Sequence, residues 1–283
     1  LDVVAALKDT NIDIYGGRYG LSSKNTTPSD IFAVFESLET SPIENFTIGL
    51  QDDVTNLSLP KNNYKLPSNT RELVIYGYGS DGMVSASKDL LKVMGSVKKE
   101  YVQGYFQYDS KKSGGVTVSN LRFDDKEIDK PYYCMAPNIM VITKDVYLNK
   151  FRVTEHLAQN GVIIINTERT FEDLHILNSI KKDLKSKNIT IFTIDAEQIA
   201  KRNHLQGKIS TIFETILLKL LGVDNYLEIL SKNIRKKFST KGENIVNSNI
   251  QCVKEAVVGL VPYKGEINYD AEEEQAHDVL DMI

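Results

Sequence analysis

Short apolar segments alternate with segments of helical periodicity from Thr70 onward, and this alternation limits the possible folds more than any other feature. The runs GVIIIN and ITIFTID, which begin at Gly161 and Ile189, are apolar on both faces, as strands covered by helices on both sides are. Strands separated by helices of roughly 10–15 residues are typical of a largely parallel sheet. We therefore predict an α/β fold with a mostly parallel sheet and flanking helices.

The periodicity also predicts where the individual elements lie. The expected strands of the sheet are residues 73–76, 101–105, 116–118, 139–142, 162–165 and 189–194. The expected helices between them are residues 84–94, 145–159, 171–184 and 196–202. After Gly207 the pattern becomes helical throughout.

The first 69 residues read as a separate, smaller α/β piece. We expect an amphipathic helix at the start, a strand at Ile12–Tyr15, and a helix capped by Ser29 or Asp30. Alternating apolar residues predict a half-buried strand over residues 46–50. Residues 58–69, SLPKNNYKLPSN, have the prolines and asparagines of a linker. A chain of 283 residues is long enough for two units, since one domain takes about 150 residues.

Composition excludes several classes of function. The chain is 41% hydrophobic and 25% charged with a net charge of -4, so no strong positive field favours nucleic acid. No apolar run approaches the roughly 18 residues of a membrane helix. Cys134 and Cys252 are too far apart for a Cys-x-x-Cys metal site or a disulfide framework, so we expect no metal site and a reducing, cytoplasmic setting.

A glycine loop follows the first strand of the larger part. Residues Gly77 to Gly82 read G-x-G-x-x-G, between an apolar strand and a helix-like segment. Glycines allow the backbone to approach an anion, and the N-terminus of the following helix offers free N–H groups and a partial positive charge. This context favours a phosphate-binding loop.

Further polar residues follow other strands of the predicted sheet. Lys111 and Lys112 come after the second strand, Asn166 ends the strand GVIIIN, and Lys208 precedes a long helix. In an open parallel sheet, ligands bind beyond the carboxyl ends of the strands. We therefore expect the glycine loop, Lys112, Asn166 and Lys208 to meet at one rim, around a ligand with several phosphates.

Other phosphate ligands fit this pattern less well. A nicotinamide dinucleotide requires an acidic residue about 20 positions past the loop, at the end of the second strand. Glu100 has about that spacing but precedes this strand, and lysines follow it. Ser80-Asp81-Gly82 matches half of a Gly-Asp-Gly…Asn thiamine diphosphate motif, but residues 107–115 contain no Asn. The four histidines are scattered, and the residues indicate no catalytic group.

Several longer stretches resemble pyruvate:ferredoxin oxidoreductases. They are GGRYGLSSK (16–24), GLQDDVTNLSLP (49–60), GYGSDGMVSASK (77–88), QGYFQYDSKKSGGVTVSNLRF (103–123), TIDAEQIA (193–200) and KGENIVNSNIQCV (241–253). The resemblance covers nearly the whole chain and thins after about residue 262. It implies an enzyme that decarboxylates pyruvate, transfers the acetyl group to coenzyme A and passes electrons to ferredoxin or flavodoxin.

The resemblance also implies which part of that enzyme the chain contains. Residues 1–40 would be the C-terminal part of a transketolase-C-terminal-like domain, and residues 41–69 a linker with a leading strand. Residues 70–258 would be the gamma domain, and residues 259–283 an acidic tail or the start of the next domain. Thiamine diphosphate, magnesium and [4Fe-4S] clusters would bind outside this chain. The remaining domains, the electron carrier and a second copy in a homodimer would be its partners, and this piece would be inactive alone.

In the family the gamma domain supplies much of the coenzyme A site. The implied contacts are Gly79, Ser80, Asp81, Gly82, Met83 and Val84 in the glycine loop, with Lys112, Asn166 and Lys208. Lys208 stands where the family usually has Arg, so the bidentate grip on a phosphate is lost. An architectural module without tight ligand binding is the main alternative, and a nicotinamide-binding domain is another.

Overall fold

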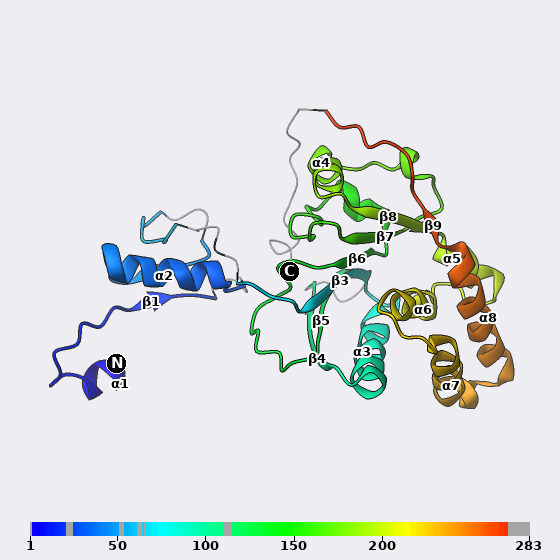
Figure 1. Ribbon diagram of the computed structural model, residues 1–283, viewed down its shortest axis with the longest axis horizontal. Helices are drawn as coiled ribbons and strands as arrows, with labels where there is room; N and C mark the ends of the chain where they lie inside the picture. The colour runs from blue at the N-terminus through cyan, green and yellow to red at the C-terminus, as the bar shows by residue number, and fades with distance from the viewer. Residues whose placement is uncertain are drawn as a thin grey trace. The chain divides into compact units, whose positions relative to one another are not determined.

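The computed structural model describes residues 2–20, 25–50, 54–60, 64, 66–109 and 115–270. It divides into two compact units, of which the smaller comprises Leu1–Ser68 with Lys130–Tyr133. The larger unit comprises Asn69–Asp129 and Cys134–Ile283. Both are drawn in Figure 1.

The smaller unit is built around one amphipathic helix. Its elements are α1 (Asp2–Ala6), β1 (Gly17–Arg18), α2 (Pro28–Thr40) and β2 (Phe46–Thr47). Helix α2 is capped by Thr27 rather than by the expected Ser29 or Asp30. Asp30 instead completes a capping box, because its carboxylate accepts the N–H of Thr27 at 2.8 Å.

The strand expected at Ile12–Tyr15 does not form. The strand is Gly17–Arg18, which pairs in parallel with Phe46–Thr47. Glycine is required at residue 17, because a Cβ there would lie 2.2 Å from the ring of Phe46. The strand expected over residues 46–50 is correspondingly short, since β2 ends at Thr47.

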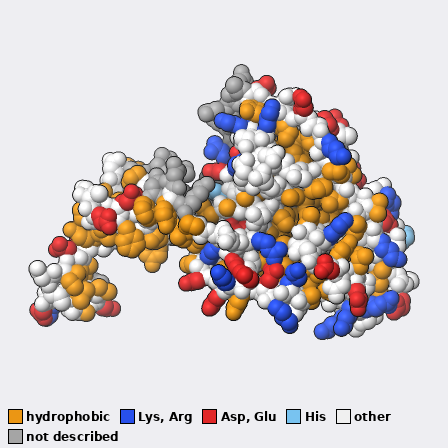
Figure 2. Space-filling model, in the orientation of Figure 1, with side chains coloured by type: hydrophobic (Ala, Val, Ile, Leu, Met, Phe, Trp, Pro, Cys, Tyr) orange, Lys and Arg blue, Asp and Glu red, His pale blue; other side chains and the backbone are white. Residues whose placement is uncertain are grey.

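The core of the smaller unit is small. It consists of Ala33, Ile48 and Leu59, whereas Ile31, Phe35 and Leu38 of α2 are exposed. Figure 2 shows hydrophobic side chains gathered on the surface of this unit.

The larger unit contains a seven-stranded sheet in the order β4-β5-β3-β6-β7-β8-β9. The strands are β3 (Arg71–Tyr78), β4 (Tyr101–Tyr108), β5 (Val116–Asp124), β6 (Ile139–Ile142), β7 (Val162–Asn166), β8 (Thr190–Ile194) and β9 (Val261–Pro262). The central strands β3, β6, β7 and β8 are parallel, which confirms the predicted fold class. The segment after residue 258, expected to be a tail or the start of another domain, adds β9 to the sheet edge, antiparallel to β8.

Strands β4 and β5 form an antiparallel hairpin, where the sequence suggested two members of a largely parallel sheet. Because β5 is also antiparallel to β3, strand β4 runs in the same direction as β3. The end of β4 and the start of β5 therefore lie at the edge of the sheet where the parallel strands end.

Helices cover both faces of the sheet (Figure 1). One face is covered by α3 (Met83–Val93) with the π-helical turn η2 (Met94–Lys98), α5 (Ala196–Arg202), α6 (Ser210–Leu220), α7 (Tyr226–Phe238) and α8 (Glu243–Gly259). The short 3-10 turn η5 (Ser239–Lys241) connects α7 to α8. The other face is covered by α4 (Asn178–Ser186) and the 3-10 turns η3 (Asp145–Asn149) and η4 (Phe171–Asp173).

Two expected helices on this second face are wrong in extent. Residues 145–159 form only the turn η3 and then an irregular segment. Tertiary bonds replace helical ones there, because Lys187 Nζ donates to the carbonyls of Thr154 and Glu155 at 2.8 and 2.7 Å. The helix expected over residues 171–184 is broken before α4, where Leu177 N–H donates to the carbonyl of Leu148.

A buried ion pair joins the hairpin to the parallel part of the sheet. Arg122 on β5 is 1% exposed, and its Nε lies 2.8 Å from Oε1 of Glu72 on β3. Arg122 also donates to Gln103 on β4 at 2.9 Å, and Glu72 Oε2 accepts the N–H of Ala136. The pair thus connects three strands and the segment that leads into β6.

Removing one partner of this pair is expected to be costly. Arg122→Met should lower the free energy of unfolding by about 3–5 kcal/mol, because it leaves the Glu72 carboxylate buried without its cation. Urea unfolding followed by circular dichroism measures the loss. The control Arg202→Met breaks the exposed pair with Glu255 and should cost about 1 kcal/mol or less. Equal losses in the two variants would show that the buried pair has no special role.

A second buried acidic group lies in the middle of α6. Burial raises the pKa of Glu214 to about 7, and the negative charge of Asp89 on α3 adds to this effect. Lys237 and Lys92 lower the pKa of Glu214 but do not offset burial.

This raised pKa makes stability depend on pH with a definite sign. Between the unfolded pKa of 4.5 and the folded pKa of about 7, the folded state binds more protons, so stability falls as pH rises through this window. Glu214→Gln should therefore be more stable than the wild type at pH 8, on the order of 1–3 kcal/mol, and similar near pH 4.5. Urea unfolding at both pH values measures the difference. The exposed control Glu228→Gln should show no such pH-dependent gain.

Candidate anion-binding site

The connections of the sheet diverge between β3 and β6. The chain leaves β3 through α3 on one face, whose Leu90 and Val93 pack with Leu73. It leaves β6 through η3 on the other face, whose Leu148 packs with Met140. In an open α/β sheet, the crevice at such a switch point, beyond the carboxyl ends of the strands, is where ligands bind. The glycine loop lies at this point.

The glycine loop has an unusual backbone. Ser80 has a φ of 83° and Gly82 a φ of 85°, so both residues adopt the left-handed conformation that glycine tolerates best. A Cβ on Gly82 would lie 3.1 Å from the Ser210 hydroxyl oxygen at the start of α6. Gly82 therefore places the glycine loop directly against the N-terminus of α6.

Asp81 faces into the protein. Its Oδ2 accepts the N–H of Tyr78 at 2.7 Å and the hydroxyl of Thr143 at 3.2 Å, and its Oδ1 accepts the N–H of Met83 at 2.8 Å. Burial raises the pKa of Asp81, although these hydrogen bonds and the charge of Lys144 act against it. Asp81 therefore orders the loop, and both its carboxylate and the Met83 N–H are already engaged within it.

Two helix N-termini leave N–H groups open beside the loop. In the part of the chain that the structure describes, the N–H groups of Gly82, Val84 and Ser85 have no hydrogen-bond partner. At the start of α6, the same holds for Ser210 and Thr211. Because unpaired N–H groups and the helix dipole both attract anions, this meeting of α3 and α6 can hold a phosphate or pyrophosphate.

Asn166 and Lys208 lie near this position, but Asn166 is buried and hydrogen-bonded whereas Lys208 is exposed. Asn166 at the end of β7 is buried, donates to the carbonyl of Thr143 at 3.0 Å and accepts the N–H of Ala196 at 2.9 Å. It thus ties together the ends of β6 and β7 and the start of α5, and one amide N–H remains for a ligand. Lys208 is exposed, just before α6, and its ammonium group forms no ion pair within the described residues.

Lys112 lies outside the described residues. The residues on either side of its loop are described and belong to the β4–β5 hairpin. Asp109 N–H donates to the carbonyl of Val116 at 3.0 Å, and the carbonyl of Gly115 accepts the N–H of Gly79 at 2.9 Å. The loop that carries Lys112 therefore begins and ends beside the glycine loop.

The sequence reasoning overlooked the residues that follow β6. Lys144 Nζ lies 5.7 Å from the centre of the Tyr78 ring and 2.8 Å from Oε1 of Glu197. Tyr147 is buried and donates its hydroxyl to the carbonyl of Gly77 at 3.2 Å. Inspecting the residues just past every strand would have found Lys144, because it lies two positions beyond Ile142.

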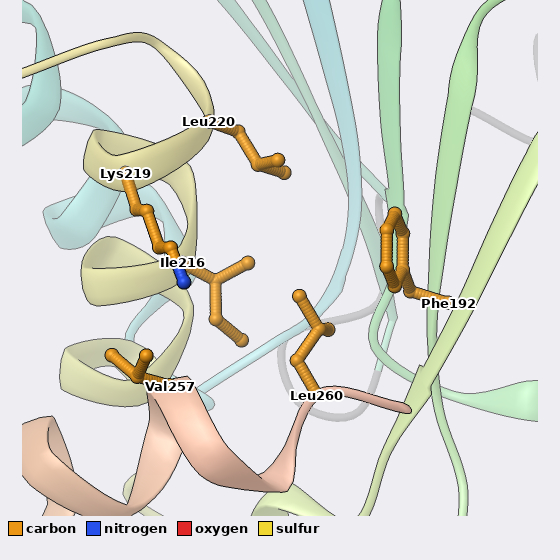
Figure 3. A pocket seen from close by; sticks show the side chains of 6 residues that line it. All are labelled: Phe192, Ile216, Lys219, Leu220, Val257 and Leu260. Carbon is orange, nitrogen blue, oxygen red and sulfur yellow. The ribbon is translucent and has the colours of Figure 1, made fainter. Parts of the chain in front are cut away.

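A cavity elsewhere in the larger unit has a different character. It has a volume of about 240 Å³ and lies beside the second half of α6, away from Ser210. It is lined by Phe192, Ile216, Lys219, Leu220, Val257 and Leu260 (Figure 3). Its walls are almost entirely apolar, so it lacks the convergent donors that the glycine loop presents.

Other features bear on cofactors and cysteine chemistry. Among the residues described, no three His, Cys, Asp or Glu side chains form a cluster that could hold a metal ion. Cys134 and Cys252 are both buried. No helix in the described ranges is both long enough and apolar enough to cross a membrane.

Known proteins share both sequence and fold with this chain. Residues 72–258, more than half of the chain, match the family pyruvate ferredoxin/flavodoxin oxidoreductase. The pyruvate:ferredoxin oxidoreductase of Moorella thermoacetica is 34% identical over 288 aligned residues, which cover 99% of this chain. The alignment covers only 25% of the length of that relative.

Two solved structures show the same fold at low sequence identity. The pyruvate oxidoreductase subunit PORC of Thermotoga maritima matches with a TM-score of 0.56 and 21% identity, covering 70% of this chain and 100% of that subunit. The 2-oxoglutarate:ferredoxin oxidoreductase of Magnetococcus marinus, solved with 2-oxoglutarate, coenzyme A and succinyl-CoA bound, matches with a TM-score of 0.53 and 13% identity. This match covers 68% of this chain and 31% of that one. On the strength of its sequence match, the chain belongs to the pyruvate ferredoxin/flavodoxin oxidoreductase family.

Proposed function

We propose that the glycine loop and the N-terminus of α6 bind the pyrophosphate of coenzyme A. The observation that carries this proposal is the contact of Gly82 with Ser210, which brings two helix N-termini together at the switch point of the sheet. A structure of the same fold, from Magnetococcus marinus, contains bound coenzyme A, which supports this choice of ligand.

The surrounding residues would each contribute a different contact to the ligand or to the loop. The N–H groups of Gly82, Val84 and Ser85 would donate to phosphate oxygens, while Gly79 and Ser80 shape the loop. Lys208 and Lys112 would supply positive charge, and the remaining amide N–H of Asn166 would donate one further bond. Asp81 and Met83 would hold the loop in position from behind, since the bonds of Asp81 are internal.

At the level of the whole protein, we infer a part in a 2-oxoacid:ferredoxin oxidoreductase. Such an enzyme would convert pyruvate and coenzyme A into acetyl-CoA and CO2, with ferredoxin or flavodoxin as electron acceptor. Thiamine diphosphate, magnesium and [4Fe-4S] clusters would bind to other parts, so this chain would be inactive alone. The named relative, about four times as long, supports this inference.

The smaller unit suggests a structural role beside the binding role. Ile31, Phe35 and Leu38 expose an apolar stripe on α2. A stripe of this kind is normally covered by another domain or subunit. We therefore infer that the other domains of the enzyme, or a second copy of it, pack on α2.

Titration of the chain with coenzyme A by calorimetry tests the binding proposal. Lys112→Ala combined with Lys208→Ala should weaken binding by about tenfold or more, because each lysine contributes a charge-assisted bond to a phosphate. The control Lys254→Ala removes an exposed lysine from α8 and should leave the affinity unchanged. Unchanged affinity in the double variant would contradict the site assignment.

A glycine substitution tests the junction of the two helices. Gly82→Ala should weaken coenzyme A binding at least severalfold, because its Cβ presses on Ser210 and its φ is positive. Gly222→Ala is a matched control, because its φ is 73° and its Cβ would meet nothing within 4 Å. Both variants should lose roughly 1–2 kcal/mol of stability through backbone strain. Only Gly82→Ala should lose affinity, and equal affinities would argue against this junction as the site.

A further inference from the structure

Lys144 lies at the switch point itself. It follows β6 by two residues, and its ammonium group stands 5.7 Å from the centre of the Tyr78 ring. Tyr78 ends β3 and donates its N–H to Asp81, so Lys144 lies directly beside the glycine loop. Lys208 lies two residues before Ser210, which meets Gly82 of the same loop at the start of α6.

Among the residues that the structure describes, the ammonium group of Lys144 pairs with one carboxylate. Its Nζ lies 2.8 Å from Oε1 of Glu197, and the two side chains are 36% and 43% exposed. Ion pairs this exposed contribute little to stability, because water screens them and both side chains lose rotamer freedom. The pair can therefore open at small cost.

Glu197 would remain stabilised after such an opening. It lies in the first turn of α5, where the partial positive charge of the helix favours a carboxylate. Asp195 already caps this helix by accepting the N–H of Gln198 at 2.8 Å. The lysine, on its flexible four-carbon stem, can turn from Glu197 toward the loop.

The charges around the loop favour movement of Lys144 toward a bound phosphate. A phosphate at the glycine loop would approach the buried Asp81 carboxylate, and the negative charges would repel each other. Asp145, the next residue, adds a further negative charge nearby, although its carboxylate accepts the hydroxyl of Thr167. The charge of Lys144 acts to lower the pKa of Asp81, so this lysine is placed to offset the repulsion.

We propose that the Lys144–Glu197 ion pair is an exchangeable latch on the anion site. Glu197 holds the ammonium group aside while the site is empty, and an incoming diphosphate takes it over. Lys144 then binds a phosphate oxygen and shields it from Asp81. This proposal rests on the proposed function of the glycine loop, and it adds a residue that determines affinity and a carboxylate that opposes binding.

Opposite effects of two substitutions distinguish a latch from a structural ion pair. Lys144→Met should weaken binding of coenzyme A and of inorganic pyrophosphate by about tenfold, because a charge-assisted bond is lost. Glu197→Gln should strengthen binding of both by about three- to tenfold, because the lysine is released. The double variant should match Lys144→Met, since Glu197 acts only through Lys144. Calorimetric titration of this chain measures all four affinities.

A matched pair provides the control. Arg202→Met and Glu255→Gln break another exposed ion pair between α5 and α8 and should change neither affinity. A structural role for Lys144 and Glu197 would instead make both substitutions weaken binding alike, or leave it unchanged. Either of those results would overturn the latch.

The two probes separate the latch from the coenzyme assignment. If the wild type binds coenzyme A but the two substitutions do not change its affinity in opposite directions, the latch is wrong and the proposed function stands. If the wild type binds pyrophosphate but not coenzyme A, and the variants differ as expected, the latch stands and coenzyme A is wrong. If neither molecule binds, both proposals fail.

Discussion

The carboxylate of Asp81 is the interaction on which the candidate site depends. It accepts the N–H of Tyr78 at the end of β3, the N–H of Met83 at the start of α3 and the hydroxyl of Thr143 beyond β6. One buried group therefore sets the geometry of a strand end, a loop and a helix start. The same bonds reduce the cost of burying a carboxylate. The carboxylate of Asp81 thus holds in position the loop whose open N–H groups lie around Gly82.

This arrangement would both attract and repel an anion at the proposed site. The proposed site would attract phosphates through helix N-termini, but the buried carboxylate of Asp81 lies directly behind the loop. Lysines on separate elements can offset the repulsion between a phosphate and Asp81, since Lys144 follows β6 and Lys208 precedes α6. The buried pair of Arg122 and Glu72 lies at the opposite end of β3 from the glycine loop. It holds the β4–β5 hairpin, which delivers Gly115 to the glycine loop, against the parallel strands.

Local patterns predicted some elements closely and others poorly. The expected strand 139–142 and helix 196–202 coincide with β6 and α5, because one is a buried run of four apolar residues and the other starts at an N-capping Asp195. The expected helix 145–159 failed, because Lys187 from a distant segment supplies the bonds that a helix would have made itself. Periodicity records which side chains are buried, and buried residues such as Phe151 and Val153 do not require a helix.

The sequence by itself determined the α/β class, the glycine loop and the family, because these depend on local composition and on contiguous motifs. It also predicted that Asn166 and Lys208 lie near the loop, and their role in binding stays a prediction. Only the tertiary structure decided that Asp81 accepts the hydroxyl of Thr143, that Gly82 meets Ser210, and that Lys144 is paired with Glu197. These facts depend on contacts between residues far apart in the chain, and the direction of a side chain is set by such contacts rather than by its neighbours in sequence.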